Sequence, residues 1–525
     1  MQQSVNITLS PEQAANDKLL KNEACAKAGV QPQRVKSIRI EHKTVDARQR
    51  MPKINLSVRL YIDEAQEGAP RICEEIKYQD VSAKPQAIVV GAGPAGLFAA
   101  LRLIELGVKP IIVERGKSVS ERKIDIAQAS RNKGLNLESN FSFGEGGAGA
   151  FSDGKLYTRS KKKGNTSRIL QIFHDQGAQD EILYEAHPHI GTDRLSVVIK
   201  NMRKTILQYG GEVHFCCKMT DLVIENGCVK GIVCEDGREF KSDAVILATG
   251  HSARDVYQML DNKKIALEAK GFAMGVRVEH PQALIDSIQY HRKERGEYLP
   301  PAAYNIVAQS AGRGVYSFCM CPGGQIVPAS TENNGIVVNG MSNSLRNSPY
   351  ANSGIVVEIR PEDLEKTEWS KYGNFSGLMF QKHVEQLAFK NNGGLGLAAP
   401  AQRLADFVKG RLSSSLPKCS YLPGAISSPM HFWLPDSIGK RLQDGFKQFD
   451  RKMHGFVTNE AVILGVESRS SSPIRIPRDR ETLQHTSIKG LFPCGEGAGY
   501  SGGITSSGID GELCAENAAR LVKGA

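Results

Sequence analysis

The sequence has no apolar run of the roughly 18 residues needed to cross a bilayer. Its first residues, MQQSVNITLSPEQ, contain neither the basic segment nor the apolar segment of a secretory signal. None of its 11 cysteines makes the C-x-x-C spacing of a redox disulfide or a zinc knuckle. We therefore expect a cytoplasmic protein with reduced thiols, no membrane partner and no metal site.

The chain is long enough for several domains. At about 150 residues per domain, 525 residues predict two to four packed domains. The net charge of +11 could attract nucleic acid, anionic lipid or a phosphorylated ligand, but it is spread over the whole chain and does not choose among them.

Residues 1–82 are expected to form a small α+β domain. Residues 5–9 have the composition of a strand, and Ser10-Pro11-Glu12-Gln13 has the pattern of a helix start, with the helix running to about Gly29. Two further strands are expected at 35–41 and 54–62. The segment between Arg34 and Arg59 is rich in Lys and Arg, which suits either a nucleic-acid surface or a solvated hairpin. Its scarcity of aromatic residues favours the hairpin, so a nucleic-acid partner is not expected, although it stays open.

A nucleotide-binding signature follows. The apolar strand expected at 86–90 runs into Gly91-Ala92-Gly93-Pro94-Ala95-Gly96, and a helix, a second strand at 110–113 and then Glu114 come next. In a dinucleotide site the first glycine permits the turn, the second leaves room for a pyrophosphate, and the third lets the helix pack on the strand. The diphosphate would lie at the helix N-terminus. Glu114 would accept hydrogen bonds from ribose hydroxyls and repel a 2′-phosphate, which leaves FAD or NAD.

Two distant segments decide between these cofactors. Residues 241–250 form an apolar strand that closes on Ala-Thr-Gly250, and residues 490–499 form another that contains Gly495 and Glu496. The second leads through Gly503 and Ile504 into a helix expected at 509–521. A second acid and a second helix N-terminus are what a long cofactor with two ends requires, and FAD is therefore preferred. These segments resemble FAD-binding flavoproteins of the glutathione-reductase type, which implies that Glu496 binds the ribityl hydroxyls and that Gly503 and Ile504 lie at the pyrimidine edge of the flavin.

The pattern Gly91–Gly96 between a strand and a helix is the fingerprint of a dinucleotide site. No second complete fingerprint occurs, so a separate NAD(P)H domain is not expected. The glycine-rich segment 143–156, which contains Gly147 and Ala148, suits a loop beside the flavin ring, or else a mobile surface loop. Arg122 could reach the pyrophosphate or lie exposed on its helix.

The motifs GAGPAGLFAA, FGEGGAGAFSDGKLYTR, HPHIGTDRL, FCMCPGG, NGMS and CGEGAGYSGGITSSGIDG together resemble an uncharacterised bacterial family of FAD-dependent dehydrogenases, the NAD(FAD)-utilising dehydrogenases. The resemblance runs over nearly the whole chain. It implies a fold and a cofactor but names no substrate.

The expected fold is α/β: an FAD-binding Rossmann-like domain with an inserted α+β substrate domain and a small N-terminal α+β domain. The expected parts are residues 1–82, 83–265, 266–470 and 471–525, of which the second and fourth form the FAD-binding domain. The candidate cofactor-binding residues are Gly91, Gly93, Pro94, Ala95, Gly96, Glu114, Arg115, Arg122, Gly147, Ala148, Gly250, Gly495, Glu496, Gly503 and Ile504.

In the substrate domain, Glu467 and Arg469 are candidates for a catalytic acid/base and an anion clamp, or for a structural ion pair. The leading hypothesis is an FAD-dependent oxidoreductase that transfers hydride between a small organic substrate and FAD, with NAD(P)H as a diffusible electron donor. The alternatives are a flavoprotein that modifies RNA bases and a non-catalytic FAD-binding redox sensor.

Overall fold

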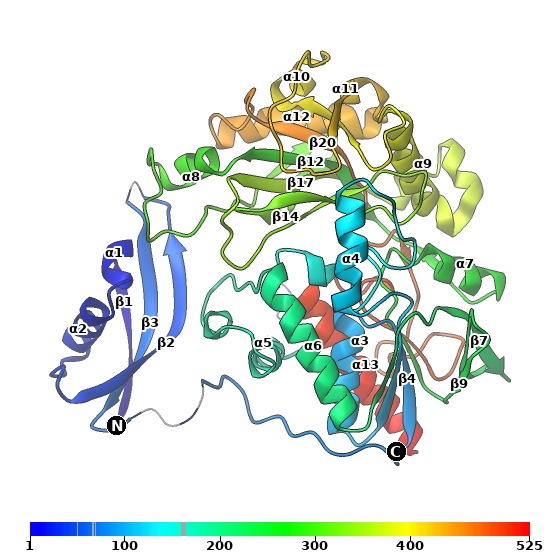
Figure 1. Ribbon diagram of the computed structural model, residues 1–525, viewed down its shortest axis with the longest axis horizontal. Coiled ribbons are helices and arrows are strands. Elements are labelled where there is room, and N and C mark those ends of the chain that lie inside the picture. Colours follow the sequence, from blue (N-terminus) through cyan, green and yellow to red (C-terminus); the bar gives the residue numbers. More distant parts are fainter. Residues whose placement is uncertain (50, 66–67, 69, 159–163, 525) are drawn as a thin grey trace.

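The computed structural model describes residues 1–49, 51–65, 68, 70–158 and 164–524. Three sheets organise the chain (Figure 1). A three-stranded sheet lies at the N-terminal side, a five-stranded parallel sheet carries the glycine fingerprint, and a seven-stranded mixed sheet lies above the parallel one. This mixed architecture, with a parallel sheet at its centre, confirms the expected α/β fold class.

The N-terminal sheet is antiparallel, with the order β1-β3-β2. Its strands are β1 (Gln2–Leu9), β2 (Val35–Asp46) and β3 (Lys53–Ile62). One helix was expected after Ser10, but two are present, α1 (Pro11–Ala14) and α2 (Asp17–Ala28). The break occurs because Asn16 leaves the helical conformation and its side chain caps the backbone N–H groups of Lys18 and Leu19. The apolar face of α2 packs on the sheet.

The parallel sheet has the order β22-β10-β4-β5-β6. Its strands are β4 (Gln86–Val90), β5 (Lys109–Val113), β6 (Glu212–His214), β10 (Val245–Leu247) and β22 (Leu491–Pro493). The strand predicted at 86–90 is confirmed, and β22 brings the C-terminal segment beside β10 in parallel register. All five strands run in one direction, so their carboxyl ends meet at one edge, which is where ligands bind in such sheets.

Alternate residues of β4 point to opposite faces of this sheet. On one face, Ala87 and Val89 contribute to a core shared with α3 (Pro94–Glu105), α6 (Thr192–Gln208) and α13 (Ile504–Lys523). On the other face, Ile88 and Val90 pack against β7 (Met219–Glu225), β8 (Cys228–Cys234) and α7 (Arg254–Asn262). The last helix begins at Ile504, five residues before the expected start. Figure 1 shows α13 beside α3.

The remaining helices and strands of this part lie around the sheet. They are α4 (Val119–Ser130), the 3-10 turn η1 (Gly147–Phe151), α5 (Thr166–Asp175), the 3-10 turn η2 (Asp180–Leu183) and β9 (Glu239–Lys241).

The seven-stranded sheet has the order β13-β14-β17-β12-β20-β18-β19. The strands are β12 (Phe272–Pro281), β13 (Val307–Ser310), β14 (Arg313–Cys321), β17 (Tyr350–Ile359), β18 (Ala399–Arg403), β19 (Ala425–Ser427) and β20 (Val462–Glu467). Helix α12 (Asp436–Lys452) packs across it with a core of buried phenylalanines that includes Phe446 and Phe449. In Figure 1, α10 (Leu404–Lys409) and α11 (Met430–Trp433) lie beside α12 at the top of the molecule.

Smaller elements complete the chain. They are the helices α8 (Gln282–Tyr290) and α9 (Ser376–Lys390), the strand pair β15 (Gln325–Pro328) and β16 (Val338–Met341), the strand pair β11 (Glu268–Ala269) and β21 (Ile474–Arg475), and the 3-10 turns η3 (Pro361–Asp363) and η4 (Glu368–Phe375).

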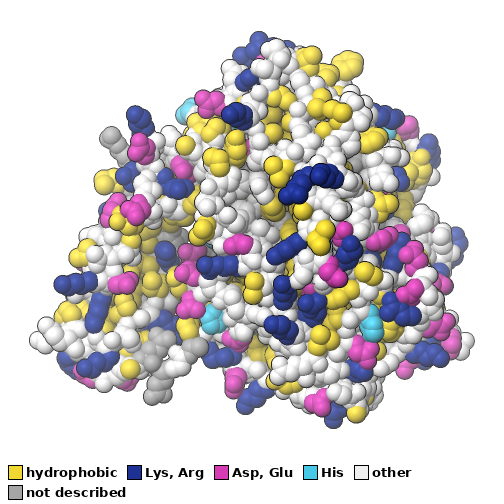
Figure 2. Space-filling model, in the orientation of Figure 1, with side chains coloured by type: hydrophobic (Ala, Val, Ile, Leu, Met, Phe, Trp, Pro, Cys, Tyr) yellow, Lys and Arg dark blue, Asp and Glu magenta, His cyan; other side chains and the backbone are white. Residues whose placement is uncertain are grey.

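The face of the molecule seen in Figure 2 carries basic, acidic and hydrophobic side chains interspersed. Within the described ranges, we find no helix that has both the length and the apolar character needed to cross a bilayer.

Candidate functional site

The glycine fingerprint links β4 to α3 with very little space around its first and last glycines. Gly91 has φ of 102°, and a Cβ there would lie 2.5 Å from the carbonyl oxygen of Ala248. A Cβ on Gly96 would lie 1.9 Å from the carbonyl oxygen of Gly91. At Gly93 the contact nearest to a Cβ is 3.8 Å away, at the Cα of Gly147. The outer glycines are therefore required by the fold, whereas Gly93 borders free space.

Helix α3 begins directly after Gly93, with Pro94 in its first turn and no side-chain cap. The first backbone N–H groups of a helix have no partner within the helix, and together with the helix dipole they favour an anion. Ala95 is buried behind this helix start, and its carbonyl oxygen is so close to α13 that a Cβ on Gly511 would lie 2.1 Å from it. The helix N-terminus is thus free to bind a phosphate, as in other nucleotide sites.

Glu114 follows β5, and its side chain is 5% exposed. Its carboxylate accepts hydrogen bonds from the backbone N–H groups of Ala92 at 2.8 Å, Gly116 at 2.9 Å and Gly144 at 3.0 Å. This acid therefore holds the fingerprint turn and the glycine-rich loop together.

The two candidate arginines after Glu114 have structural partners. Arg115 forms ion pairs with Glu138 at 2.6 Å and Asp255 at 2.9 Å. Arg122 is fully buried and donates hydrogen bonds to the carbonyl oxygens of Asn140, Gly144 and Glu145. Burial lowers the pKa of Arg122 to about 10. Its side chain is not exposed on α4, which was one of the two expectations. Instead, Arg122 orders the loop that leads to Gly147.

Gly147 and Ala148 lie in η1, the turn that follows this loop. A Cβ on Gly147 would lie 3.2 Å from the Cα of Gly93, and one on Gly149 would lie 3.2 Å from the side chain of Ile504. The glycine-rich segment therefore contacts both the fingerprint and the first residue of α13.

The C-terminal half of the site is more open. A Cβ on Gly250, Gly502 or Gly503 would meet no atom of the described residues within 4 Å. These glycines lie after β10 and before α13, at the carboxyl edge of the parallel sheet. Gly495, with φ of 74°, donates its N–H to Asp510 on α13 at 2.7 Å. Such a glycine-lined, open edge between two helix N-termini is a cradle that fits a dinucleotide cofactor.

Glu496 and His251 face each other at this open edge, with Oε1 and Nε2 3.6 Å apart. The Glu496 carboxylate has no hydrogen-bond partner among the described residues, and burial raises its pKa to about 7. Burial, together with the charges of Arg469 and Arg254, lowers the pKa of His251 to about 3. The imidazole is therefore neutral. His251 was missed in the sequence, where its position directly after Ala-Thr-Gly was the available signal.

The structure does not bring Glu467 and Arg469 together. Glu467, at the end of β20, pairs with Arg277 at 2.8 Å, and the two side chains are 2% and 0% exposed. Burial raises the pKa of Glu467.

Arg469 pairs instead with Glu385 of α9 at 3.1 Å, and Arg254 of α7 pairs with the same carboxylate at 2.9 Å. Although burial alone would raise it, the charges of the two arginines lower the pKa of Glu385 to about 2. Both predicted residues are thus held in separate buried ion pairs.

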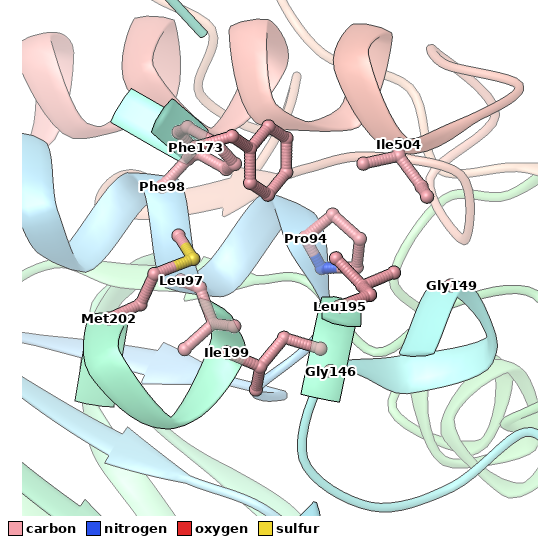
Figure 3. A pocket seen from close by; sticks show the side chains of 10 residues that line it. All are labelled: Pro94, Leu97, Phe98, Gly146, Gly149, Phe173, Leu195, Ile199, Met202 and Ile504. Atoms are coloured by element: carbon pink, nitrogen blue, oxygen red, sulfur yellow. The ribbon is translucent and has the colours of Figure 1, made fainter. Parts of the chain in front are cut away.

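A small cavity of about 10 Å³ lies behind the fingerprint (Figure 3). Its lining is apolar and comes from α3, α5, α6, α13 and the glycine-rich segment: Pro94, Leu97, Phe98, Gly146, Gly149, Phe173, Leu195, Ile199, Met202 and Ile504. This volume is comparable to that of one water molecule, far below that of a dinucleotide, so it is a packing gap and not the cofactor site.

Among the described residues, one group has the composition of a metal site. Cys494, Asp510 and Cys514 are buried and place their ligand atoms within 4.8 Å of one another. Arg478, however, donates to Asp510 at 2.5 and 3.0 Å and to the sulfur of Cys514 at 3.4 Å. The guanidinium already neutralises this carboxylate.

Arginines of the basic N-terminal segment also have acidic partners. Ion pairs join Arg34 to Asp63, Arg48 to Asp46, and Arg59 to Glu41. These pairs reduce the charge that the segment offers to a nucleic acid.

Three family models match different parts of the chain. Residues 85–275 match the family described as pyridine nucleotide-disulphide oxidoreductase, and residues 271–470 match the one described as FAD-dependent protein, C-terminal domain-like. Residues 1–61 match a domain of unknown function.

Two curated relatives were found. An uncharacterized protein of Clostridium beijerinckii is 40% identical over 529 residues, which covers 98% of this chain and 97% of that protein. The thiamine thiazole synthase of Aeropyrum pernix is 26% identical over 185 residues, covering 32% of this chain and 56% of the synthase.

Among solved structures, a flavoprotein/dehydrogenase from Cytophaga hutchinsonii has 13% identity and a TM-score of 0.34, over 84% of this chain and 79% of that one. The flavin-dependent brominase Bmp2 has 13% identity and a TM-score of 0.37, over 84% and 80%. Likenesses this weak carry no argument about function.

Proposed function

The chain belongs to an uncharacterised bacterial family of FAD-dependent proteins, and on that premise we propose that it transfers hydride between a small organic substrate and FAD. The open carboxyl edge of the parallel sheet carries the proposal. There, the described residues leave space beside Gly250, Gly502 and Gly503, and they donate no hydrogen bond to the Glu496 carboxylate.

We assign the two ends of FAD to the two halves of this edge. The N-terminus of α3 with Gly93 would hold the pyrophosphate, and Glu114 would lie at the adenosine ribose. The segment from Gly495 to Ile504 would hold the ribityl chain and the ring system. FAD, when bound, supplies a ring that accepts or releases a hydride.

Several charged or titratable residues lie around the part of the site that we assign to the flavin ring. His251 is neutral, and the pKa of Glu496, near 7, allows it to hold or release a proton close to neutral pH. Arg254, Glu385 and Arg469 form a buried ion-pair network that ties α7 to α9 and to the end of β20. This network joins α7, which packs on the parallel sheet, to the proposed substrate domain.

We propose NAD(P)H from solution as the electron donor. The residues matched by the pyridine nucleotide family include a single complete fingerprint, which we assign to FAD, so the nicotinamide would have no nucleotide domain of its own. The direct test is anaerobic stopped-flow absorbance of the purified yellow protein mixed with NADH, NADPH and a panel of small metabolites.

We expect rapid bleaching of the flavin band by one nicotinamide and recovery of the band with one class of metabolite. The Gly93→Val variant, expected to be colourless, is mixed with free FAD and the same donors, and any bleaching of that FAD measures the contribution of contaminants. If no donor bleaches the flavin faster than free FAD is bleached, the oxidoreductase proposal fails and the redox-sensor alternative is favoured.

A further inference from the structure

Four sequence motifs without an assigned role meet where the parallel sheet joins the substrate domain. They are the segment DGK after η1, the HPHIG segment before α6, the CMCPGG segment at the end of β14, and the loop MSNSLR after β16. Lys155 forms an isolated β-bridge with His189. A Cβ on Gly191 would lie 2.2 Å from the backbone nitrogen of Ser344, and one on Gly323 would lie 1.7 Å from the carbonyl oxygen of Arg346. The four backbones are therefore in direct contact.

One ion pair and two hydrogen bonds hold this junction together. Asp153 pairs with Arg346 and accepts a hydrogen bond from Ser342, so the loop after η1 is tied to the substrate domain. The carbonyl oxygen of Leu156 accepts a hydrogen bond from the hydroxyl of Thr505 at 2.7 Å, which ties the same loop to the first turn of α13. Lys155 thus lies between the proposed ring end of the cofactor site and the substrate sheet.

Strand β14 is distorted at this junction. Its register with β17 shifts between Phe318 and Cys321, which is the pattern of a β-bulge, and Cys319 has φ of 44°. A bulge redirects a side chain out of the regular alternation of a strand. As a result, Cys319 is exposed, although its neighbours Met320 and Cys321 are buried.

A buried ion pair supports the bulge from behind. Arg277 donates to the carbonyl oxygen of Cys319 at 2.7 Å while it pairs with Glu467 and donates to Asn352. The space for this arginine depends on Gly340, because a Cβ there would lie 2.3 Å from the guanidinium. Arg277 is thus a positioning residue that holds Cys319 in its unusual conformation.

Among the described residues at the junction, one cation has no partner. Arg346 is paired with Asp153, and Arg277 with Glu467. Over the part of the chain that the structure describes, Lys155 has neither an ion pair nor a side-chain hydrogen bond. Lys155 is near enough to Cys319 for its charge to act on that thiol.

We infer that Lys155 and Cys319 line the substrate site, and that the substrate is a small organic anion whose charged group binds Lys155 beside the Cys319 thiol. This inference rests on the proposed function, since it names the substrate class of the same site. An unpaired ammonium at the edge of an otherwise neutralised cluster favours an anion, and a thiol beside it is a weak hydrogen-bond donor.

The test uses two alkylating reagents of nearly equal size, anionic iodoacetate and neutral iodoacetamide, on the full-length FAD-loaded protein at pH 8.5. In both reactions the thiolate forms a carbon–sulfur bond and iodide leaves. Mass spectrometry of the peptides follows Cys319 and, as a matched control, Cys216, which is also exposed and has φ of 48°. The rate ratio of the two reagents at one thiol does not depend on the thiolate fraction, so it reports the local preference for an anion.

We expect the iodoacetate-to-iodoacetamide ratio to be about fivefold higher at Cys319 than at Cys216. Lys155→Met should reduce the ratio at Cys319 to that of Cys216, and Lys155→Arg should retain it. Flavin content of each variant shows whether the site is still formed. In the wild-type protein, added succinate should slow the alkylation of Cys319 and leave that of Cys216 unchanged, which provides a test without any substitution.

Equal ratios at the two cysteines, no labelling of Cys319, or an unchanged preference in Lys155→Met would overturn the inference. None of these readouts requires electron transfer. A protein that shows the anion preference but no flavin reduction would therefore contradict the proposed reaction alone, and the reverse result would contradict the substrate class alone.

Discussion

Glu114 and Glu496 follow two strands of the same parallel sheet, yet their surroundings differ completely. Glu114 accepts three backbone hydrogen bonds and is 5% exposed. Glu496 accepts none from the described residues, is 28% exposed and has a pKa raised to about 7 by burial. At the Glu114 end of the proposed cradle the protein itself supplies the hydrogen-bond donors. At the other end, the Glu496 carboxylate can still accept hydrogen bonds from a ligand. Substitution of Glu114 should therefore weaken the fold as well as cofactor binding, whereas substitution of Glu496 should not destabilise the fold.

The largest effect is expected at Gly96. A Cβ there would lie 1.9 Å from a carbonyl oxygen, so Gly96→Ala must displace the fingerprint turn. We expect a loss of about 4 kcal/mol or more in the free energy of unfolding, measured by urea denaturation. Gly93→Val is the matched control, since Gly93 has ordinary φ and a Cβ there would make only an ordinary van der Waals contact, 3.8 Å from the Cα of Gly147. It should retain the fold while it loses the yellow colour. Equal stability of the two variants would contradict this account of the turn.

A smaller loss is expected for Glu114→Ala. Three buried N–H groups would lose their acceptor, which costs about 3 kcal/mol in total once water reaches some of them. Both the unfolding free energy and the flavin absorbance should fall. A stable, fully yellow variant would show that Glu114 serves neither the loops nor the cofactor.

The smallest effect is expected for Glu496→Gln, and it should depend on pH. Because the folded pKa lies above the unfolded value of 4.5, the native state binds the extra proton, and its stability falls as pH rises from about 4.5 to 7. The glutamine variant lacks this loss. In FAD-free protein we expect it to be more stable than wild type by about 1–2 kcal/mol at pH 8 and equally stable at pH 4. Thermal denaturation at the two pH values measures the difference, and a constant difference would argue against burial of a titrating Glu496.

Much of this arrangement is readable in the sequence, because it depends on local patterns. The strand 86–90, the fingerprint and the presence of strands within 241–250 and 490–499 follow from apolar runs bounded by glycine, although these last two strands are shorter than expected, at 245–247 and 491–493. Ion-pair partners are not local. Nothing near Arg469 indicates that Glu385 and Arg254 hold it, and nothing near Arg277 indicates Glu467.

Two further features were hidden for similar reasons. The helix expected from Ser10 to Gly29 is split by Asn16, whose side chain competes with the helix for backbone N–H groups. The exposure of Cys319 depends on a bulge between β14 and β17, and the register of two strands is set by their pairing rather than by either strand alone.

The central claim is that the segments around Gly91–Gly96 and Gly495–Ile504 form one cradle for a single FAD. A crystallographic difference map of the FAD-loaded protein tests it most directly. The account predicts continuous density for one FAD per chain, with the pyrophosphate at the start of α3 and the ring system beside Gly503 and Ile504. Density for FAD elsewhere, or a cradle filled by side chains in protein that retains its flavin, would contradict the account.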